Sequence, residues 1–223
     1  MITINNSVFD AKGADKKAKV YGITLNGSED ITISGCEFRN MGYSSILNDS
    51  TGNVVVEDCS FDCSNVYNPI EGSQKVDNGN VSIRRCEFAG TPGNNYINFY
   101  QFKDGSEHLI ENCSFAPGIE TNAIRVSNKT SAGTRIVVKD CEYTYAEGEP
   151  TEYTNFILCQ DYTSNSGVKQ DFTNVKFEIE NVKCNGVVLE DGVAPAKGGI
   201  FYVYQDGAGI ITGQDNDPKI TIK

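Results

Sequence analysis

The sequence contains no tryptophan, a single histidine (His108) and no long apolar run. Without tryptophan the chain lacks the aromatic platform on which sugar-binding grooves commonly rely. The absence of 18 consecutive apolar residues argues against a transmembrane helix. Residues 1–10 show neither the basic start nor the apolar core of a secretory signal. We therefore expect a protein that is made in a cytoplasm and does not insert into a membrane.

Basic residues are also scarce, with 19 Lys and Arg against 30 Asp and Glu and a net charge of −11. Phosphate binding needs clustered Lys and Arg, so we expect no nucleic-acid partner. Cys59 and Cys63 are spaced C-x3-C, but no second pair completes a zinc site. Asp206 and residues 214–218 fit a plain turn better than a calcium site. We expect no metal and no cofactor, and eight free thiols in a reducing compartment.

A short segment recurs along the chain, with successive copies starting 23 to 29 residues apart except for a last step of 41. Recurrence at such a spacing indicates a solenoid. The copies are ITINNSVF (2–9), ITISGCEF (31–38), VVVEDCSF (54–61), VSIRRCEF (81–88), HLIENCSF (108–115), IVVKDCEY (136–143) and FEIENVKC (177–184). The final KITIK (219–223) resembles the first strand of one more copy. Residues 1–223 are therefore predicted to form a single domain.

Each copy reads as two short strands joined by a tight bend. The first, third, sixth and eighth residues are mostly apolar or small, so the alternation of a strand breaks between the third and the sixth. The fifth residue is Gly, Asn or Asp in six of the seven copies, and Arg85 is the exception. Those three residue types tolerate a left-handed backbone, which predicts the bend at the fifth position.

Stacking of the copies would place equivalent residues about 4.8 Å apart and build ladders of like side chains. We expect buried thiols at the sixth position and buried aromatic rings at the eighth. The fourth position points outward and alternates in charge, which would fix the register at the surface. The ladders are Cys36, Cys59, Cys86, Cys113 and Cys141; Phe9, Phe38, Phe61, Phe88, Phe115 and Tyr143; and Glu57, Arg84, Glu111, Lys139 and Glu180.

A further strand follows most copies, and the least clear case lies around Ile70. The candidates are residues 22–25, 44–47, 96–102, 123–126, 155–159 and 199–204. Three strands per turn and no amphipathic helix predict an all-β fold, a right-handed single-stranded parallel β-helix of about seven coils. A left-handed hexapeptide helix needs fewer residues per turn, and a β-sandwich would not keep one motif in phase throughout.

The units ITISGCEF, VVVEDCSF, VSIRRCEF and HLIENCSF resemble the repeats of the pectate-lyase-like right-handed β-helix superfamily, and the resemblance covers nearly the whole chain. That superfamily includes secreted lyases and hydrolases, phage tailspikes and other virion proteins. No family-specific catalytic motif matches a position of this chain. The first copy starts directly in a coil, and the exposed end of a β-helix is a row of unpaired backbone groups that a neighbouring subunit could cover.

These observations favour a non-enzymatic phage virion structural protein, such as a capsid decoration, head fibre or tail appendage. Such a protein would assemble in the host cytoplasm and present its β-helix on the particle surface. Its expected partners are other virion proteins or copies of itself, bound through the solenoid ends. Host-surface glycans are a further candidate partner.

The alternative is a polysaccharide lyase or hydrolase, such as a phage depolymerase, or an adhesin that binds glycans without turnover. Its catalytic candidates are Glu37, Glu87 and Glu142, at the seventh position of alternate copies. Alternate coils would place their backbones about 9.6 Å apart, which loosely fits an inverting acid/base pair. A solvated face with spaced charges explains the three residues better. We therefore favour no enzymatic activity.

Two further kinds of side chain need a location. His108 occupies a position otherwise filled by Ile, Val or Phe, so we expect it to be partly buried and structural. Tyr96, Tyr100 and Tyr202 could face outward, either in a glycan groove or in a protein contact surface.

Overall fold

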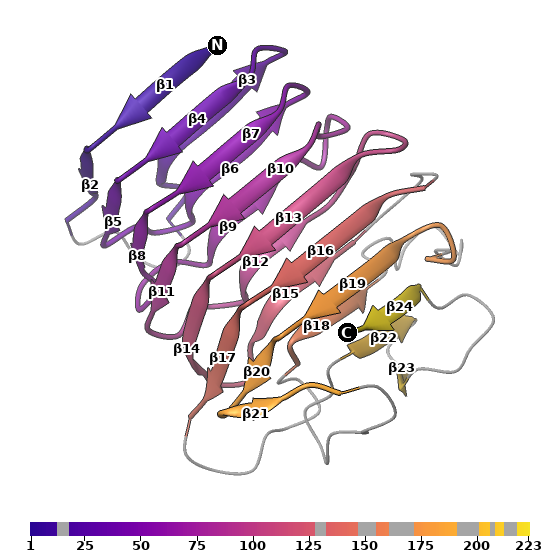
Figure 1. Ribbon diagram of the computed structural model, residues 1–223. Coiled ribbons are helices and arrows are strands. Elements are labelled where there is room, and N and C mark those ends of the chain that lie inside the picture. The colour runs from indigo at the N-terminus through magenta and orange to yellow at the C-terminus, as the bar shows by residue number, and fades with distance from the viewer. Residues whose placement is uncertain are drawn as a thin grey trace.

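The structure, a computed structural model, is an all-β parallel solenoid with no helix among the residues it describes (Figure 1). These are residues 1–12, 18–127, 133–146, 155–160, 172–190, 201–205, 208–211 and 218–223. Of Gln160 and residues 201–205 and 208–211 only the backbone is described. Strands of successive turns lie side by side and build three sheets, here named A, B and C.

Each sheet takes one strand from every turn, so strands that neighbour each other in a sheet are distant in sequence. Sheet A runs β1 (Ile2–Asn5), β4 (Ile31–Ser34), β7 (Val54–Glu57), β10 (Val81–Arg84), β13 (Glu107–Glu111), β16 (Arg135–Lys139), β19 (Lys176–Glu180) and β24 (Lys219–Ile222). Sheet B runs β2 (Val8–Asp10), β5 (Glu37–Arg39), β8 (Ser60–Asp62), β11 (Glu87–Ala89), β14 (Ser114–Gly118), β17 (Glu142–Tyr145), β20 (Lys183–Cys184) and β21 (Val187–Val188). Sheet C runs β3 (Tyr21–Gly27), β6 (Ser44–Ser50), β9 (Asn68–Gly72), β12 (Asn95–Phe99), β15 (Asn122–Val126), β18 (Ile157–Gln160), β22 (Phe201–Gln205) and β23 (Ala208–Ile211).

The parallel solenoid is confirmed over about five turns. From β4–β6 to β16–β18, all three strands of each turn pair in parallel with the turn before and the turn after. The count of seven coils and the right hand stay predictions. The third strand of each turn is where the sequence placed it, including the least clear one, which is β9 around Ile70.

The bend between sheets A and B has the backbone that the sequence predicted. All seven residues at the fifth position have positive φ, between 47° and 61°. Arg85 adopts a φ of 49° although it lacks the tolerance of Gly, Asn or Asp. Its guanidinium is held by Asp58, at 2.7 Å, and by Glu57, at 2.9 Å, in the preceding turn. The side chain thus partly offsets the cost of the backbone conformation.

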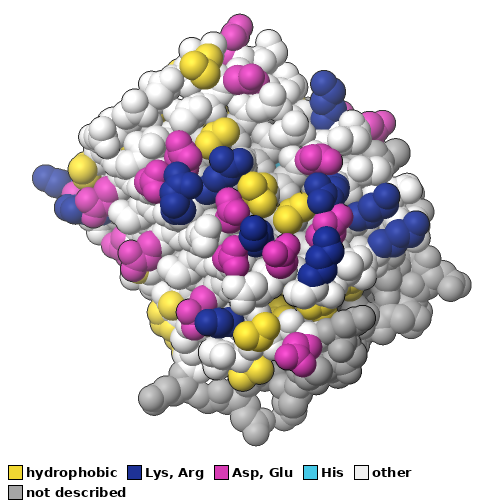
Figure 2. All heavy atoms as spheres, viewed as in Figure 1, with side chains coloured by type: hydrophobic (Ala, Val, Ile, Leu, Met, Phe, Trp, Pro, Cys, Tyr) yellow, Lys and Arg dark blue, Asp and Glu magenta, His cyan; other side chains and the backbone are white. Residues whose placement is uncertain are grey.

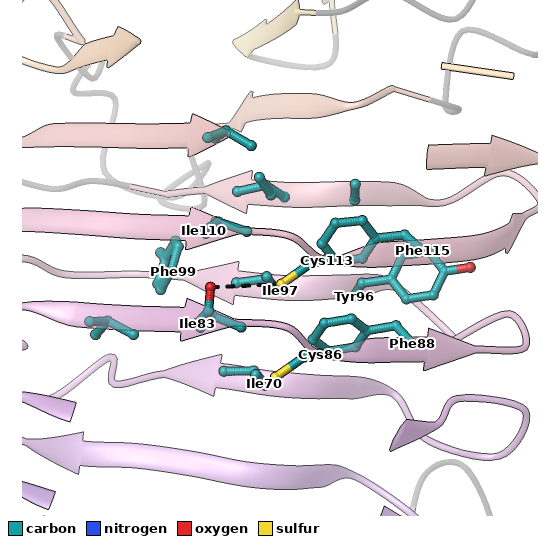
Figure 3. Close-up of a cluster of buried hydrophobic side chains, with 14 of the residues drawn as sticks. Ile70, Ile83, Cys86, Phe88, Tyr96, Ile97, Phe99, Ile110, Cys113 and Phe115 are labelled. Carbon is teal, nitrogen blue, oxygen red and sulfur yellow. Dashed lines mark hydrogen bonds between the residues drawn. The ribbon is translucent and has the colours of Figure 1, made fainter. Parts of the chain in front are cut away.

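The core contains the thiol and ring ladders (Figure 3). Successive phenylalanine rings from Phe9 to Phe115 stack with centroids 4.7 to 5.0 Å apart. Each thiol of the ladder donates to backbone carbonyls, as Cys113 does to Ile83 in the preceding turn at 3.7 Å. All eight cysteines are buried, and none of them forms a disulfide. Both ladders are confirmed as core filling.

The expectation that Tyr96 faces outward is wrong. Its ring is fully buried and lies edge-on to Phe115, with centroids 5.5 Å apart. The hydroxyl donates to the carbonyls of Gly90 and Pro117. The physical reason is that alternation fails at the start of the sheet C strand, where Tyr96 and Ile97 both enter the core.

Candidate functional site

The carboxylates proposed for catalysis lie on the outer face of sheet B. The register places one serine between neighbouring glutamates, Ser60 between Glu37 and Glu87, and Ser114 between Glu87 and Glu142. Glu87 and Glu142 are exposed. Glu37 accepts hydrogen bonds from Arg39, one of them at 2.6 Å. The structure thus arranges the three carboxylates as a row of spaced surface charges and does not bring any two of them together.

The outer face of sheet A carries charges of both signs in close mixture (Figure 2). The predicted register is confirmed, since each residue from Glu57 to Glu180 at the fourth position pairs with its neighbour in the ladder. The ion pairs need one correction. Lys139 lies 3.9 Å from Glu111, as the ladder predicts, but Glu57 is bound by Arg85 of the bend. The left-handed backbone at Arg85 turns its long side chain back along the preceding turn.

The best-formed ion pair of this face lies outside the predicted ladder. Two nitrogens of Arg135 donate to the two carboxylate oxygens of Glu178, both at 2.8 Å. Glu107 and Lys223 extend the group at 3.6 and 3.5 Å. The hydrogen bonds from Arg135 lower the pKa of Glu178 to about 2. Charges on this face neutralise one another, which favours solubility and register over acid/base chemistry.

His108 is fully buried rather than partly buried as expected, at 1% exposure. Its Nδ1 accepts the amide hydrogen of Val81 at 3.2 Å, and Nε2 lies 3.0 Å from the hydroxyl of Ser106. Phe102 covers the ring at a centroid distance of 4.3 Å. Burial lowers the pKa of His108 to about 3, so the imidazole is neutral and serves as a fixed hydrogen-bonding core residue.

A buried polar group on sheet C was missed by the sequence analysis. Glu71, Asn98 and Arg125 occupy one register position on three successive strands. They alternate with the core isoleucines Ile70, Ile97 and Ile124, so they point away from the core, yet none is more than 4% exposed. We call Glu71, Asn98 and Arg125 the sheet C cluster. Polar types at one outward position of successive strands were the available signal.

The surroundings of the sheet C cluster combine hydrogen bonds and an aromatic ring. The hydroxyl of Ser44 donates to Glu71 at 2.5 Å, and the guanidinium carbon of Arg125 lies 5.9 Å from the ring centroid of Tyr100. Burial raises the pKa of Glu71, although hydrogen bonds from neighbouring side chains oppose the rise. Tyr100 is itself 6% exposed, so the expectation that it faces solvent is wrong. Asn98 lies between Glu71 and Arg125 in the register, and a carboxyl with a raised pKa can act as a proton donor once a substrate reaches it.

The first turn presents an uncovered edge. Among the described residues, no strand pairs with the outer side of β1, β2 or β3, and we call these three strands the N-terminal edge (Figure 1). Ile2 and Val8 are 47% and 61% exposed, and Ile4 and Phe9 are partly buried against the end of the core. The strand β1 carries no lysine, proline or bulge, which are the features that usually block edge pairing.

The opposite end of the solenoid is built differently. Sheet B ends in β21, which pairs antiparallel with β20, and sheet C ends in β23, which pairs antiparallel with β22. Sheet A ends in β24, where Lys219 and Lys223 flank the strand and are exposed. Short antiparallel end strands and lysines are known defences against edge-to-edge association. Among the described residues the two ends therefore differ in strand direction and in charge.

No family model matches the chain, and the searches of curated proteins and of solved structures found no match. Within the described ranges, no group of three or more His, Cys, Asp or Glu side chains is placed to hold a metal ion. Asp206 and residues 214–217 lie outside those ranges, as does the side chain of Tyr202. None of the described residues belongs to a helix with the length and apolar character of a membrane span.

Proposed function

We propose that the protein is a non-catalytic structural component of a multi-copy assembly, of the kind that phage virions carry as a capsid decoration, head fibre or tail appendage. The observation that carries the proposal is the inequality of the two ends. One end presents three strands whose outer sides pair with no described strand, together with the exposed Ile2 and Val8. The other ends in antiparallel strands and lysines. A solenoid with one adhesive end can attach at that end and present its sides to solvent.

The sides of the solenoid support the same proposal. Sheet A carries paired charges, and sheet B carries single glutamates separated by serines. These faces suit a soluble surface that does not associate further. Assembly in the host cytoplasm and partners among other virion proteins belong to this proposal. A glycan-binding role on the particle surface would use the same exposed sides.

The finer description of the fold is also a proposal. We infer a right-handed solenoid of seven coils, of the pectate-lyase-like type, because seven copies of the motif keep one register and parallel crossover connections are overwhelmingly right-handed. An experimental density map at side-chain resolution would check the hand and the count.

The test of the function asks whether the chain is part of a particle. Particles purified from the producing cells should contain the chain in many copies when their proteins are quantified by mass spectrometry. Thr3→Lys places a charge on the N-terminal edge and should abolish incorporation. Thr221→Lys is the matched control, because Thr221 occupies the same place in the I-T-I triplet of β24, and it should be incorporated normally. Absence of the wild-type chain from every purified particle would refute the proposal.

A polysaccharide lyase or hydrolase remains the second candidate, and one observation favours it. The sheet C cluster places Glu71, whose pKa is raised by burial, two strands from Arg125. Incubation with acidic polysaccharides should then yield new reducing ends or unsaturated products. Glu71→Gln should abolish that activity, whereas Glu87→Gln on the exposed face of sheet B should retain it. No product from any polysaccharide would eliminate this candidate.

A further inference from the structure

We propose that the N-terminal edge binds the same edge of a second copy of this chain, with β1 pairing antiparallel to β1 of the partner about a two-fold axis at Thr3. The inference rests on the proposed function, because both use the N-terminal edge. It goes further by naming the partner, the direction of the strands and the register.

The backbone of β1 offers the required groups. The amide of Ile2 donates to the carbonyl of Asp30 at 2.9 Å, so Ile2 directs its hydrogen-bonding groups toward the following turn. Backbone groups alternate sides along a strand, and therefore Thr3 and Asn5 direct their amides and carbonyls to the uncovered edge. The carbonyl of Asn5 accepts the hydroxyl of Ser7 at 2.8 Å, whereas no described residue pairs with the amide and carbonyl of Thr3, which are a template for another strand.

The sequence of β1 is complementary to itself. In an antiparallel pair centred on Thr3, Thr3 faces Thr3 of the second copy, and Ile2 faces Ile4. The isoleucines of both copies then lie on the core side, and the two threonines lie on the solvent side, where Thr–Thr pairs are favourable. Each Thr3 would exchange two hydrogen bonds with its counterpart, and the amide of Asn5, whose carbonyl already accepts the hydroxyl of Ser7, would donate to the carbonyl of Met1.

The other end of the molecule argues against a head-to-tail arrangement. In such a stack β1 would have to extend sheet A beyond β24, while β2 and β3 would meet β21 and β23. Both of those strands run antiparallel to their neighbours, so the parallel ladders could not continue through them. A two-fold pairing needs neither strand, buries Ile2 and Ile4 of both copies, and closes after two copies.

The first experiment measures the mass of the chain in solution by sedimentation equilibrium over a wide concentration range. We expect a reversible dimer of twice the 24.3 kDa chain mass. Thr3→Pro removes the central amide that faces the uncovered edge, and proline is tolerated at such an edge position. This variant should keep the circular dichroism and melting temperature of the wild type and should be monomeric. Thr3→Val keeps the amide and should still dimerise.

The second experiment tests the register by oxidative cross-linking. All native cysteines are buried, so a new edge thiol is the reactive one. Facing residues of a hydrogen-bonded antiparallel pair have Cα atoms about 5.5 Å apart, within the range of a disulfide. Thr3→Cys should therefore form a covalent dimer. Asn5→Cys and Thr221→Cys should not, because neither position meets itself across the axis.

A chain that is monomeric at every concentration, or that cross-links as readily through Asn5→Cys or Thr221→Cys as through Thr3→Cys, would overturn the inference. A Thr3→Pro variant that still has the mass of a dimer in sedimentation equilibrium would also overturn the inference. The two proposals can fail separately. A monomer that still enters particles through the Thr3 edge refutes the self-pairing alone, and a Thr3-dependent dimer that is absent from particles refutes the proposed function alone.

Discussion

Acid should destabilise this protein through His108. The ring is 1% exposed, and Nδ1 already accepts the amide hydrogen of Val81. Protonation of Nδ1 would therefore replace this hydrogen bond by a repulsive contact between the N–H of His108 and the N–H of Val81 inside the core. Burial lowers the pKa of His108 from 6.5 to about 3, whereas in the unfolded chain the imidazole titrates near its ordinary value.

The sign and size of the effect follow from linkage. Between about pH 6.5 and pH 3 the unfolded chain binds a proton at His108 that the folded chain does not, so stability falls as the pH falls through this window. At about 1.4 kcal/mol per unit of pKa, the loss is on the order of 5 kcal/mol. That is a large share of the roughly 5–15 kcal/mol that stabilises a typical domain.

The assay is urea unfolding followed by circular dichroism at a series of pH values. Surface carboxylates also titrate in acid, so the wild type is compared with His108→Phe, which mimics Phe177 two strands further along sheet A. The variant loses the bond to Val81 and should be less stable at pH 7. Its stability should nevertheless fall less steeply with acid, by up to about 1.4 kcal/mol per pH unit. Parallel pH curves for the two proteins would refute the reasoning.

Three further predictions concern the ladders and the bend. Phe88→Ala removes a ring stacked between two others at 4.7 and 4.9 Å and should cost about 3–5 kcal/mol in urea unfolding; a cost below about 1 kcal/mol would contradict the packing. Arg85→Gly loses exposed ion pairs but places a glycine at the left-handed backbone, so its stability should stay within about 1 kcal/mol of wild type. Arg85→Val should cost about 2 kcal/mol, because a β-branched residue does not tolerate this conformation. Equal stabilities of the two variants would be inconsistent with the bend. A thiol reagent should modify the eight cysteines slowly in the native protein and completely in denaturant, and fast reaction of the native ladder would place its thiols at the surface.

The sequence was sufficient for sheets A and B because each position is sampled once per turn. A single Asn112 between two short strands says little about the backbone. Gly, Asn or Asp at the fifth position of six copies predicts one backbone conformation, and the positive φ values confirm it. The same repetition favours a core role for Cys86 over a reactive or metal-binding role, because thiols at equivalent positions of successive turns face the same core. Register followed from the same argument.

Sheet C was less predictable because its strands begin irregularly. Two adjacent residues, Tyr96 and Ile97, both enter the core, so counting by twos assigns Tyr96 to the wrong face. The sequence of β9 gives a weak strand signal because it contains Pro69 and Gly72, and both residue types are rare in strand interiors. The burial of Glu71 depends on what lies over the outer face of the sheet, and a strand pattern carries no information about that.

In a solenoid, a residue type repeated in every turn usually stabilises the packing of one turn on the next, because equivalent positions have equivalent neighbours. Functional residues are therefore expected where a ladder changes type or ends. The outward position of sheet C is Leu47 before the sheet C cluster and Leu158 after it, so the two charged residues at this position, Glu71 and Arg125, lie in the middle turns. The N-terminal edge is where every ladder ends, and there the apolar side chains of Ile2 and Val8 remain exposed. The exposed Lys219 and Lys223 lie at the far end of sheet A, whereas β1 carries no charged side chain, so a charge placed at Thr3 is the most direct test of the pairing proposed for the N-terminal edge.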